Sequence, residues 1–233
     1  MEISIIIPSY NEEKRIGKSL EKIWKYFKNK GFPFEIIVVD DGSTDKTVEI
    51  VEKFKEGKKE IRILKHDKNK GKGAAVRTGV INSKGNLILF TDADLSTPIE
   101  EFEKLKKAID DGYDIAIGSR GLPESKIIIP QPWYRRYLGK IFPLLVRILV
   151  TNKFKDTQCG FKLFKRAVAK KLFDELKTNG FAFDVEILYN SIKMGYKIKE
   201  VGVIWSNSFF SSVAIFKDPL KMFISLLKIR SFK

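Results

Sequence analysis

Short apolar runs alternate with longer amphipathic segments through the first half of the chain. The runs have the length and the Ile/Val/Leu content of buried strands, and they cover Ile3–Ile7, Glu35–Val39, Ile61–Leu64, Leu87–Phe90 and Ile115–Ile117. Apolar residues recur at helical spacing between them, over Glu12–Phe27, Thr44–Phe54, Gly73–Asn82 and Ile99–Ile109. Consecutive strand and helix units of this kind predict an α/β fold with a Rossmann-like, mostly parallel central sheet flanked by helices.

The second half of the chain follows a different pattern. Tyr134–Val150 and Pro219–Ile229 combine an apolar stripe with basic residues, as amphipathic helices do at a membrane surface. Asp156–Phe164 is expected to form a short strand or an extended segment. The length of 233 residues suits one large domain, so a single domain covering 1–233 is expected.

Two carboxylates follow the predicted strand that ends at Phe90. In a parallel sheet the ligand lies beyond the carboxyl ends of the strands, so polar residues at these ends are candidates for a binding site. Asp92 and Asp94 are separated only by Ala93. This spacing lets them share Mg²⁺ or Mn²⁺, with the phosphate oxygens of a substrate completing the shell of the ion. The simpler interpretation is a turn that ends the strand and caps the next helix.

Two further strand ends carry candidate ligand contacts. Asp40 could accept a hydrogen bond from a base N–H or a ribose hydroxyl, although a loop with an ordinary helix cap at Ser43 or Asp45 would also explain this region. Lys72 lies in a glycine-containing turn ahead of a helix, where backbone N–H groups suit an anion. A solvated basic turn explains that turn equally well.

Composition narrows the functional classes. The formal charge of +15 favours binding to nucleic acid, anionic lipid or phosphorylated substrates, without choosing between them. A single cysteine, Cys159, excludes an internal disulfide framework, and together with the lone His66 it leaves no zinc cluster. A reducing compartment fits best.

The membrane signal is that of a surface protein. The apolar stretch Ile141–Val150 contains Pro143 and Arg147 and is far shorter than the roughly 20 residues needed to cross a bilayer. The amino-terminal run Ile3–Ile7 does not resemble a signal peptide. We therefore expect a cytoplasmic protein, peripheral on the cytoplasmic face of a membrane.

Five segments of the first half carry a resemblance to a known family. IIIPSYNEE, VVDDGSTD, NKGKGAAVRTG, FTDADLSTP and IGSR, in this order, resemble the family 2 inverting glycosyltransferases, which have the GT-A fold. Further along, RRYLGKIFPLLVRIL, DTQCGFKLF and FAFDVEIL resemble the dolichyl-phosphate glucosyltransferases, with the dolichyl-phosphate mannose synthases as near relatives. The match extends to about Trp205.

The resemblance implies a role for individual residues. It implies that residues 1–120 bind a nucleotide sugar, and that residues 121–233 bind the acceptor and face the membrane. By the same resemblance, Asp94 would ligate the metal, and Asp92 would lie near the ribose or share the ion. Arg120 would lie near the phosphates, where its fork suits a bidentate contact; a salt bridge to a surface carboxylate is the alternative, and we favour the phosphate contact. The residues implied in nucleotide binding are Pro8, Tyr10, Glu12, Asp40, Lys72, Asp92 and Ala93.

The chain departs from its relatives after Trp205. Ser206–Ser212 has no Arg, Lys or Gly, whereas the relatives continue with a basic, Gly-containing loop. Lys217 or Lys221 could replace that loop at the acceptor phosphate, although a solvent-facing lysine is the simpler interpretation of each.

The expected reaction moves a hexose from a nucleoside diphosphate sugar to a polyprenyl phosphate, with inversion. UDP-glucose is the favoured donor and GDP-mannose the second. By the resemblance, Asp184 matches the position of the catalytic base. A hydroxyl acceptor would need Asp184 or Glu186 as a base, whereas a phosphate acceptor is already ionised and needs none.

A basic nucleic-acid-binding module is the rival functional class. The strand-end carboxylates would repel a phosphate backbone, so no nucleic-acid partner is expected. The sequence indicates no oligomeric state.

Overall fold

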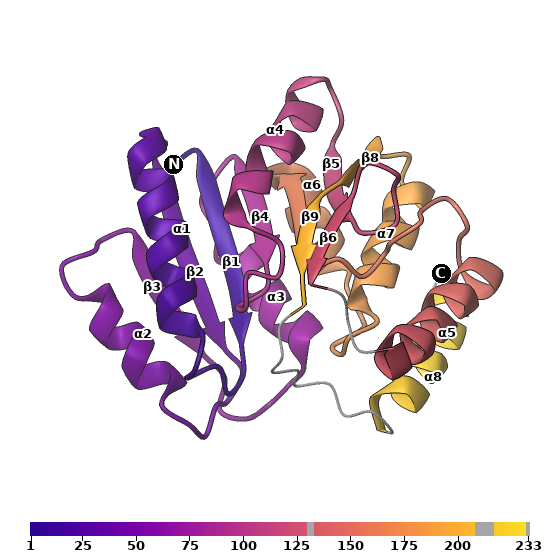
Figure 1. Cartoon of the computed structure of the whole chain (residues 1–233), viewed down its shortest axis with the longest axis horizontal. Coiled ribbons are helices and arrows are strands. Elements are labelled where there is room, and N and C mark those ends of the chain that lie inside the picture. Colours follow the sequence, from indigo (N-terminus) through magenta and orange to yellow (C-terminus); the bar gives the residue numbers. More distant parts are fainter. Residues whose placement is uncertain (130–132, 208–216, 232–233) are drawn as a thin grey trace.

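The computed structural model describes residues 1–129, 133–207 and 217–231 (Figure 1). Side chains are described for these residues except 133–140 and 217–221. Parts of the Ser206–Ser212 loop and the side chains of Lys217 and Lys221 therefore lie outside the described residues.

Seven strands form the central sheet, in the order β3-β2-β1-β4-β7-β5-β8. All neighbouring pairs are parallel except those of β7, which is antiparallel to both β4 and β5. A separate parallel pair joins β6 and β9. The strands are β1 (Ile3–Ser9), β2 (Phe34–Asp40), β3 (Ile61–Lys65), β4 (Leu87–Thr91), β5 (Ile115–Ser119), β6 (Lys126–Ile129), β7 (Phe161–Lys165), β8 (Ile198–Gly202) and β9 (Ile204–Ser206).

Helices cover both faces of this sheet. One face packs against α1, α2 and α4, and the other packs against α3, α6 and α7. Alternate residues of β1 serve the two faces, because Ile5 belongs to the first cluster and Ile6 to the second. The helices are α1 (Ile16–Lys30), α2 (Thr47–Lys55), α3 (Lys72–Ile81), the 3₁₀ turn η1 (Ile99–Glu101), α4 (Phe102–Asp110), α5 (Trp133–Leu149), α6 (Arg166–Asp174), α7 (Phe183–Lys193) and α8 (Lys217–Ser231).

The two amphipathic helices expected in the second half are present as α5 and α8. They lie side by side at the end of the molecule opposite α2 and β3 (Figure 1). A small cluster that includes Val146 of α5, Val185 of α7 and Leu226 of α8 holds them against the rest of the fold. No helix in the described part of the chain is long and apolar enough to cross a bilayer.

Two of the predicted boundaries that the structure changes bear on the site. The first helix begins at Ile16 rather than Glu12, because Asn11 has a left-handed φ of 56° and the backbone N–H of Glu12 donates to Thr47 Oγ1 instead of continuing a helix. Within the segment Asp156–Phe164, β7 begins only at Phe161. Its antiparallel position was not predicted, and this position brings residues of the second half against the carboxyl end of β4.

Candidate functional site

The carboxyl ends of β1, β2 and β4 meet at one edge of the sheet, and the predicted site residues are gathered there. Pro8 pairs with Val39 in the register of β1 and β2, one step before Asp40 ends its strand. Tyr10 follows β1 and is 37% exposed, whereas Ala93 is buried beneath the loop after β4. The sheet therefore positions these residues through neighbouring parallel strands.

Asp92 is held by a lysine and by a glycine. Lys72 Nζ, at the start of α3, lies 2.7 Å from Asp92 Oδ1. The backbone N–H of Asp92 donates to the carbonyl of Gly160 at 3.1 Å, because β7 runs antiparallel beside β4 and pairs Phe161 with Thr91. A Cβ atom on Gly160 would lie 2.0 Å from Asp92 Oδ2, so the missing side chain is what makes room for this carboxylate. The Asp92 side chain stays 33% exposed.

Asp94 lies beside Arg15 and Glu12. Arg15 Nη1 is 3.6 Å from Asp94 Oδ2, while Arg15 Nε and Nη2 donate to the two carboxylate oxygens of Glu12 at 2.7 and 2.6 Å. Asp94 Oδ1 accepts from the backbone N–H of Ser96. Burial raises the pKa of Glu12, and the charges of Asp94 and Asp92 add to this against the opposing effect of Arg15. The carboxyl groups of Glu12, Asp92 and Asp94 thus share one electrostatic environment.

The donor set at this edge fits a hard divalent cation that is completed by a ligand. Asp92 and Asp94 are both partly exposed, with side-chain exposures of 33% and 20%, and both raise the pKa of Lys72. In the described part of the chain, no group of three or more His, Cys, Asp and Glu residues could hold a metal ion. Two carboxylates together with diphosphate oxygens form the kind of shell that Mg²⁺ takes in phosphate-handling proteins.

Asp40 has an unused acceptor atom. Its Oδ2 accepts from the backbone N–H groups of Gly42 and Ser43 at 3.2 and 3.1 Å. Its Oδ1 is buried and has no hydrogen-bond partner among the described residues. A buried oxygen without a donor is costly, and a ligand N–H or O–H would satisfy it. The neighbouring Asp41 is different, because His66 and the backbone N–H groups of Lys70 and Gly71 all contact it.

The glycine-containing turn before α3 uses several of its backbone N–H groups within the protein. The N–H groups of Lys70 and Gly71 already donate to Asp41, and that of Ala74 donates to Asn179. Gly71 has a φ of +103° and lies against the backbone of Asn179, so the glycine serves close packing. Lys72 belongs to the site through its ammonium group. Burial lowers the pKa of Lys72, but the nearby carboxylates, Asp92 first, outweigh this and raise it.

Arg120 differs from the expectation. Its Nε and Nη2 donate to the two oxygens of Asp156, at 2.6 and 2.9 Å, so the bidentate fork is engaged by a buried carboxylate and is not held open for a phosphate. Burial raises the pKa of Asp156, yet the guanidinium outweighs it and holds this pKa at about 2. The guanidinium lies 5.5 Å from the ring centre of Trp205 and stays 30% exposed, which leaves an edge that a ligand could reach.

Asp184 lies deep in the same region, at the start of α7. Its Oδ1 accepts from Lys162 Nζ at 2.5 Å, and both side chains are almost fully buried. Lys162 also donates to the carbonyl of Cys159. Burial raises the pKa of Asp184, against the charges of Lys162 and Lys72. Both oxygens of Glu186 accept backbone N–H groups, from Lys177 and Thr178, so Glu186 holds a loop and is not available as a base.

Sequence reasoning missed three residues of this site: Arg15, Gly160 as the neighbour of Asp92, and Lys162 as the partner of Asp184. The Glu12 to Arg15 spacing is the only local signal that could have suggested one of these pairs. The other two depend on β7.

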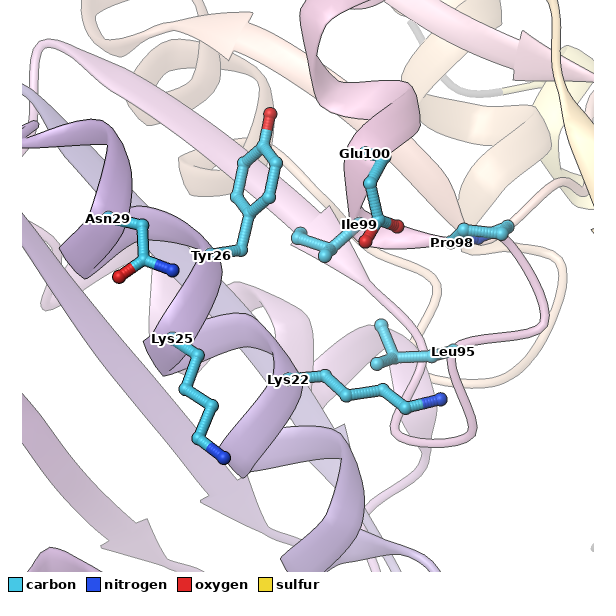
Figure 2. Close-up of a pocket in the computed structure, with 8 residues that line it drawn as sticks. All are labelled: Lys22, Lys25, Tyr26, Asn29, Leu95, Pro98, Ile99 and Glu100. Carbon is cyan, nitrogen blue, oxygen red and sulfur yellow. The ribbon is translucent and has the colours of Figure 1, made fainter.

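A separate hollow of about 430 Å³ lies between α1 and the segment that follows Asp94 (Figure 2). It is lined by Lys22, Lys25, Tyr26, Asn29, Leu95, Pro98, Ile99 and Glu100. None of the predicted site residues lines it, and Glu100 is its single acidic side chain. It lacks the paired carboxylates of the strand-end site.

Comparison with known proteins identifies the family of the chain. Residues 4–173 match the family described as Glycosyl transferase family 2. The chain belongs to this family. This confirms the resemblance seen in the sequence and makes the protein a glycosyltransferase.

Curated relatives of this family 2 transferase are dolichyl-phosphate beta-glucosyltransferases. The protein of that name from Homo sapiens is 38% identical over 242 residues, which cover 98% of this chain and 75% of the relative. The one from Drosophila melanogaster is 38% identical and covers 95% and 72%. The one from Saccharomyces cerevisiae is 39% identical and covers 98% and 74%.

Solved structures confirm the GT-A fold of the transferase. A glucosyl-3-phosphoglycerate synthase from Mycobacterium tuberculosis, crystallised with Mn²⁺ and UDP-glucose, has a TM-score of 0.70 at 18% identity, covering 97% of this chain and 79% of that one. A mannosyl-3-phosphoglycerate synthase from Rubrobacter xylanophilus also has a TM-score of 0.70, at 17% identity, covering 99% and 73%. At these identities the likeness concerns the fold.

Proposed function

We propose that this transferase moves glucose from UDP-glucose to a dolichyl or other polyprenyl phosphate, with inversion at the anomeric carbon. The observation that carries the proposal is the edge of the sheet where two partly exposed carboxylates, Asp92 and Asp94, and the buried, unpartnered oxygen of Asp40 follow the ends of parallel strands. The names of the relatives that align over nearly the whole chain support the donor sugar and the acceptor. GDP-mannose is the second candidate donor.

The donor nucleotide is bound by the ends of β1 and β2. Asp40 Oδ1 accepts from a base N–H or a ribose hydroxyl, because it is buried and otherwise lacks a donor among the described residues. Tyr10, which is partly exposed beyond β1, and Pro8 supply the wall of this pocket.

The diphosphate is bound at the end of β4. Asp92 and Asp94 would hold Mg²⁺ or Mn²⁺, which neutralises negative charge on the leaving diphosphate. Lys72, 2.7 Å from Asp92, places a positive charge beside the same phosphates. The exposed edge of Arg120 adds a further cationic group. These groups are preorganised, since Asp92 is fixed by Gly160 and Arg120 by Asp156.

The acceptor phosphate needs no general base. A phosphate oxygen is ionised at neutral pH, so it attacks the anomeric carbon directly while the diphosphate leaves from the opposite face. Asp184 is held by Lys162 and then orients the sugar through its second oxygen. The alternative is a saccharide or lipid hydroxyl acceptor with Asp184 as base. Lys162 already engages Oδ1 of Asp184, which leaves a single carboxylate oxygen for that role, while burial raises the pKa of the group.

The protein acts at the cytoplasmic face of a membrane, to which α5 and α8 attach it peripherally. The outward side chains of these helices are apolar and between 44% and 67% exposed, namely Ile141, Leu144, Ile148, Ile224 and Leu227. Burying the exposed part of each is worth about 1 kcal/mol. The exposed Arg147, Lys228 and Arg230 add about 1 kcal/mol each near anionic headgroups. The combined free energy of apolar burial and charge attraction suits reversible binding to a membrane surface.

A transfer assay tests the proposal. The purified protein is offered labelled UDP-glucose or GDP-mannose with polyprenyl phosphate, in Mg²⁺, Mn²⁺ or chelator. We expect a labelled lipid from UDP-glucose that disappears with chelator and in the Asp94→Asn variant. The proposal fails if no donor gives a lipid product, or if Mn²⁺ does not tighten UDP binding in calorimetry.

A further inference from the structure

Strand β6 exposes more apolar surface than a folded protein usually leaves open. All residues of Lys126–Ile129 are exposed, with Ile127 at 51%, Ile128 at 63% and Ile129 at 39%. Consecutive exposed isoleucines in a strand favour aggregation, and in this sequence Lys126 and Pro130 flank the run, whose side chains nevertheless stay exposed. Three consecutive exposed isoleucines therefore indicate a surface that binds a ligand or partner when the protein is active.

A β-bulge explains how consecutive side chains come to be exposed together. The register passes from Ile127 opposite Trp205 to Ile129 opposite Ser206, so two steps along β6 match one step along β9. Ile128 is the extra residue. A bulge bends its strand and redirects side chains, and bulges are common next to active sites. In the described part of the chain β6 pairs only with β9, and Figure 1 shows the two strands side by side.

The isoleucine run connects the strand-end site to the membrane-facing helices. Toward the site, the N–H of Ser206 in β9 donates to the carbonyl of Ser96, two residues after Asp94. Trp205, the partner of Ile127, lies 5.5 Å from the Arg120 guanidinium. Toward the helices, α5 begins four residues after Ile129, a distance of at most about 14 Å along the chain.

We infer that Ile127, Ile128 and Ile129 form the seat of the hydrocarbon chain of the acceptor lipid, next to its phosphate. This rests on the proposed function. Leading away from the cationic strand-end site at Arg120, the surface is aromatic at Trp205 and then aliphatic on β6. A lipid whose phosphate end lies in that site would place its hydrocarbon chain along this surface. The run spans about 7 Å, so it contacts the isoprene units nearest the phosphate.

Two double variants, one on β6 and one on α5, separate binding of the lipid at β6 from general attachment to the bilayer. The β6 variant is Ile127→Ser with Ile128→Ser. The matched control on α5 is Leu144→Ser with Ile148→Ser, which removes side chains of 56% and 67% exposure. The transfer kinetics of each variant are measured in detergent solution, where no bilayer contributes, and binding to anionic vesicles is measured separately. Thermal unfolding checks that each variant folds. Replacing the same β6 residues by valine keeps them apolar and serves as the rescue.

The β6 variant should raise the KM for polyprenyl phosphate at least tenfold, with kcat and the KM for the donor sugar unchanged. The valine variant should restore the KM, and the α5 variant should keep the wild-type KM in detergent while losing binding to anionic vesicles. A β6 variant with wild-type KM and weaker vesicle binding would overturn the inference, because β6 would then touch only the bilayer. A β6 variant that turns a wild-type dimer into a monomer would also overturn it in favour of a second copy.

Direct binding of polyprenyl phosphate keeps this result distinct from the proposed function. If the wild type transfers no sugar but binds polyprenyl phosphate in a manner that depends on Ile127 and Ile128, the proposed function fails and the lipid seat stands. If the protein transfers sugar but the β6 substitutions do not change its binding of polyprenyl phosphate, the proposed function stands and the lipid seat on β6 is refuted.

Discussion

Replacing Gly160 with alanine is the sharpest test of how the carboxylate site is built. The new Cβ would lie 2.0 Å from Asp92 Oδ2 and 2.3 Å from Asp92 Cγ, where an ordinary contact begins at 3.4 Å. Gly160 is not among the glycines with positive φ, so the alanine backbone is unstrained and the effect comes from this contact. Asp92 must move by more than 1 Å or rotate away from Lys72.

The cost should fall on binding and catalysis more than on folding. A displacement of about 1 Å in a catalytic group can lower the rate about 100-fold. Because Asp92 is one-third exposed, it can move toward solvent, so the loss of stability should stay at or below about 1–3 kcal/mol. We expect kcat/KM for sugar transfer to fall about 100-fold and the Mn²⁺-dependent gain in UDP affinity to shrink by at least tenfold. Transfer kinetics, calorimetry and thermal unfolding measure these three quantities.

Gly180→Ala is the matched control. A Cβ on Gly180 meets nothing within 4 Å, and this glycine also has no positive φ, so activity and stability should stay close to wild type. If Gly160→Ala kept wild-type kcat/KM and wild-type Mn²⁺-dependent UDP binding, the position of Asp92 beside Gly160 would be irrelevant to the reaction, and the metal assignment would lose its support.

Three further predictions concern buried groups, namely Lys162 with Asp184, Asp156 and Cys159. Lys162→Met should destabilise the fold by about 3–5 kcal/mol in chemical denaturation, because Asp184 would be left buried without its partner, and adding Asp184→Asn should recover most of this loss. If the acceptor is a phosphate, that double variant should also keep kcat within about tenfold; a collapse by orders of magnitude would indicate a hydroxyl acceptor. The lowered pKa of Asp156, about 2 when folded against an ordinary value of 3.8, means that its stabilising contribution of about 2 kcal/mol is complete above pH 4 and is lost as the pH falls toward 2. Asp156→Asn should therefore flatten the acid side of the stability curve, and an unchanged slope would refute the pairing with Arg120. Burial raises the pKa of Cys159 to about 11, so a thiol reagent at pH 8 should label it only after unfolding; rapid labelling of the native protein would contradict its burial.

The strand-end residues were predictable because their positions depend on local pattern. Buried parallel strands are apolar on both faces, so each run was visible, and the run predicted at Ile61–Leu64 is the observed strand Ile61–Lys65. Once those strands are parallel, their carboxyl ends must share one edge of the sheet. That Asp40, Asp92 and Asp94 follow strands at one edge of the sheet can therefore be predicted without any coordinates.

The sequence by itself determined the α/β class, the strand-end carboxylates and the two amphipathic helices, since periodicity and strand ends are local properties. The tertiary structure alone decided that β7 enters the sheet antiparallel between β4 and β5, which brings Gly160 against Asp92 and joins Lys162 to Asp184. The tertiary structure also decided that the guanidinium group of Arg120 pairs with the Asp156 carboxylate. The physical reason is that strand order and charge pairing join residues tens of positions apart, and many pairings satisfy the same local pattern until packing selects one.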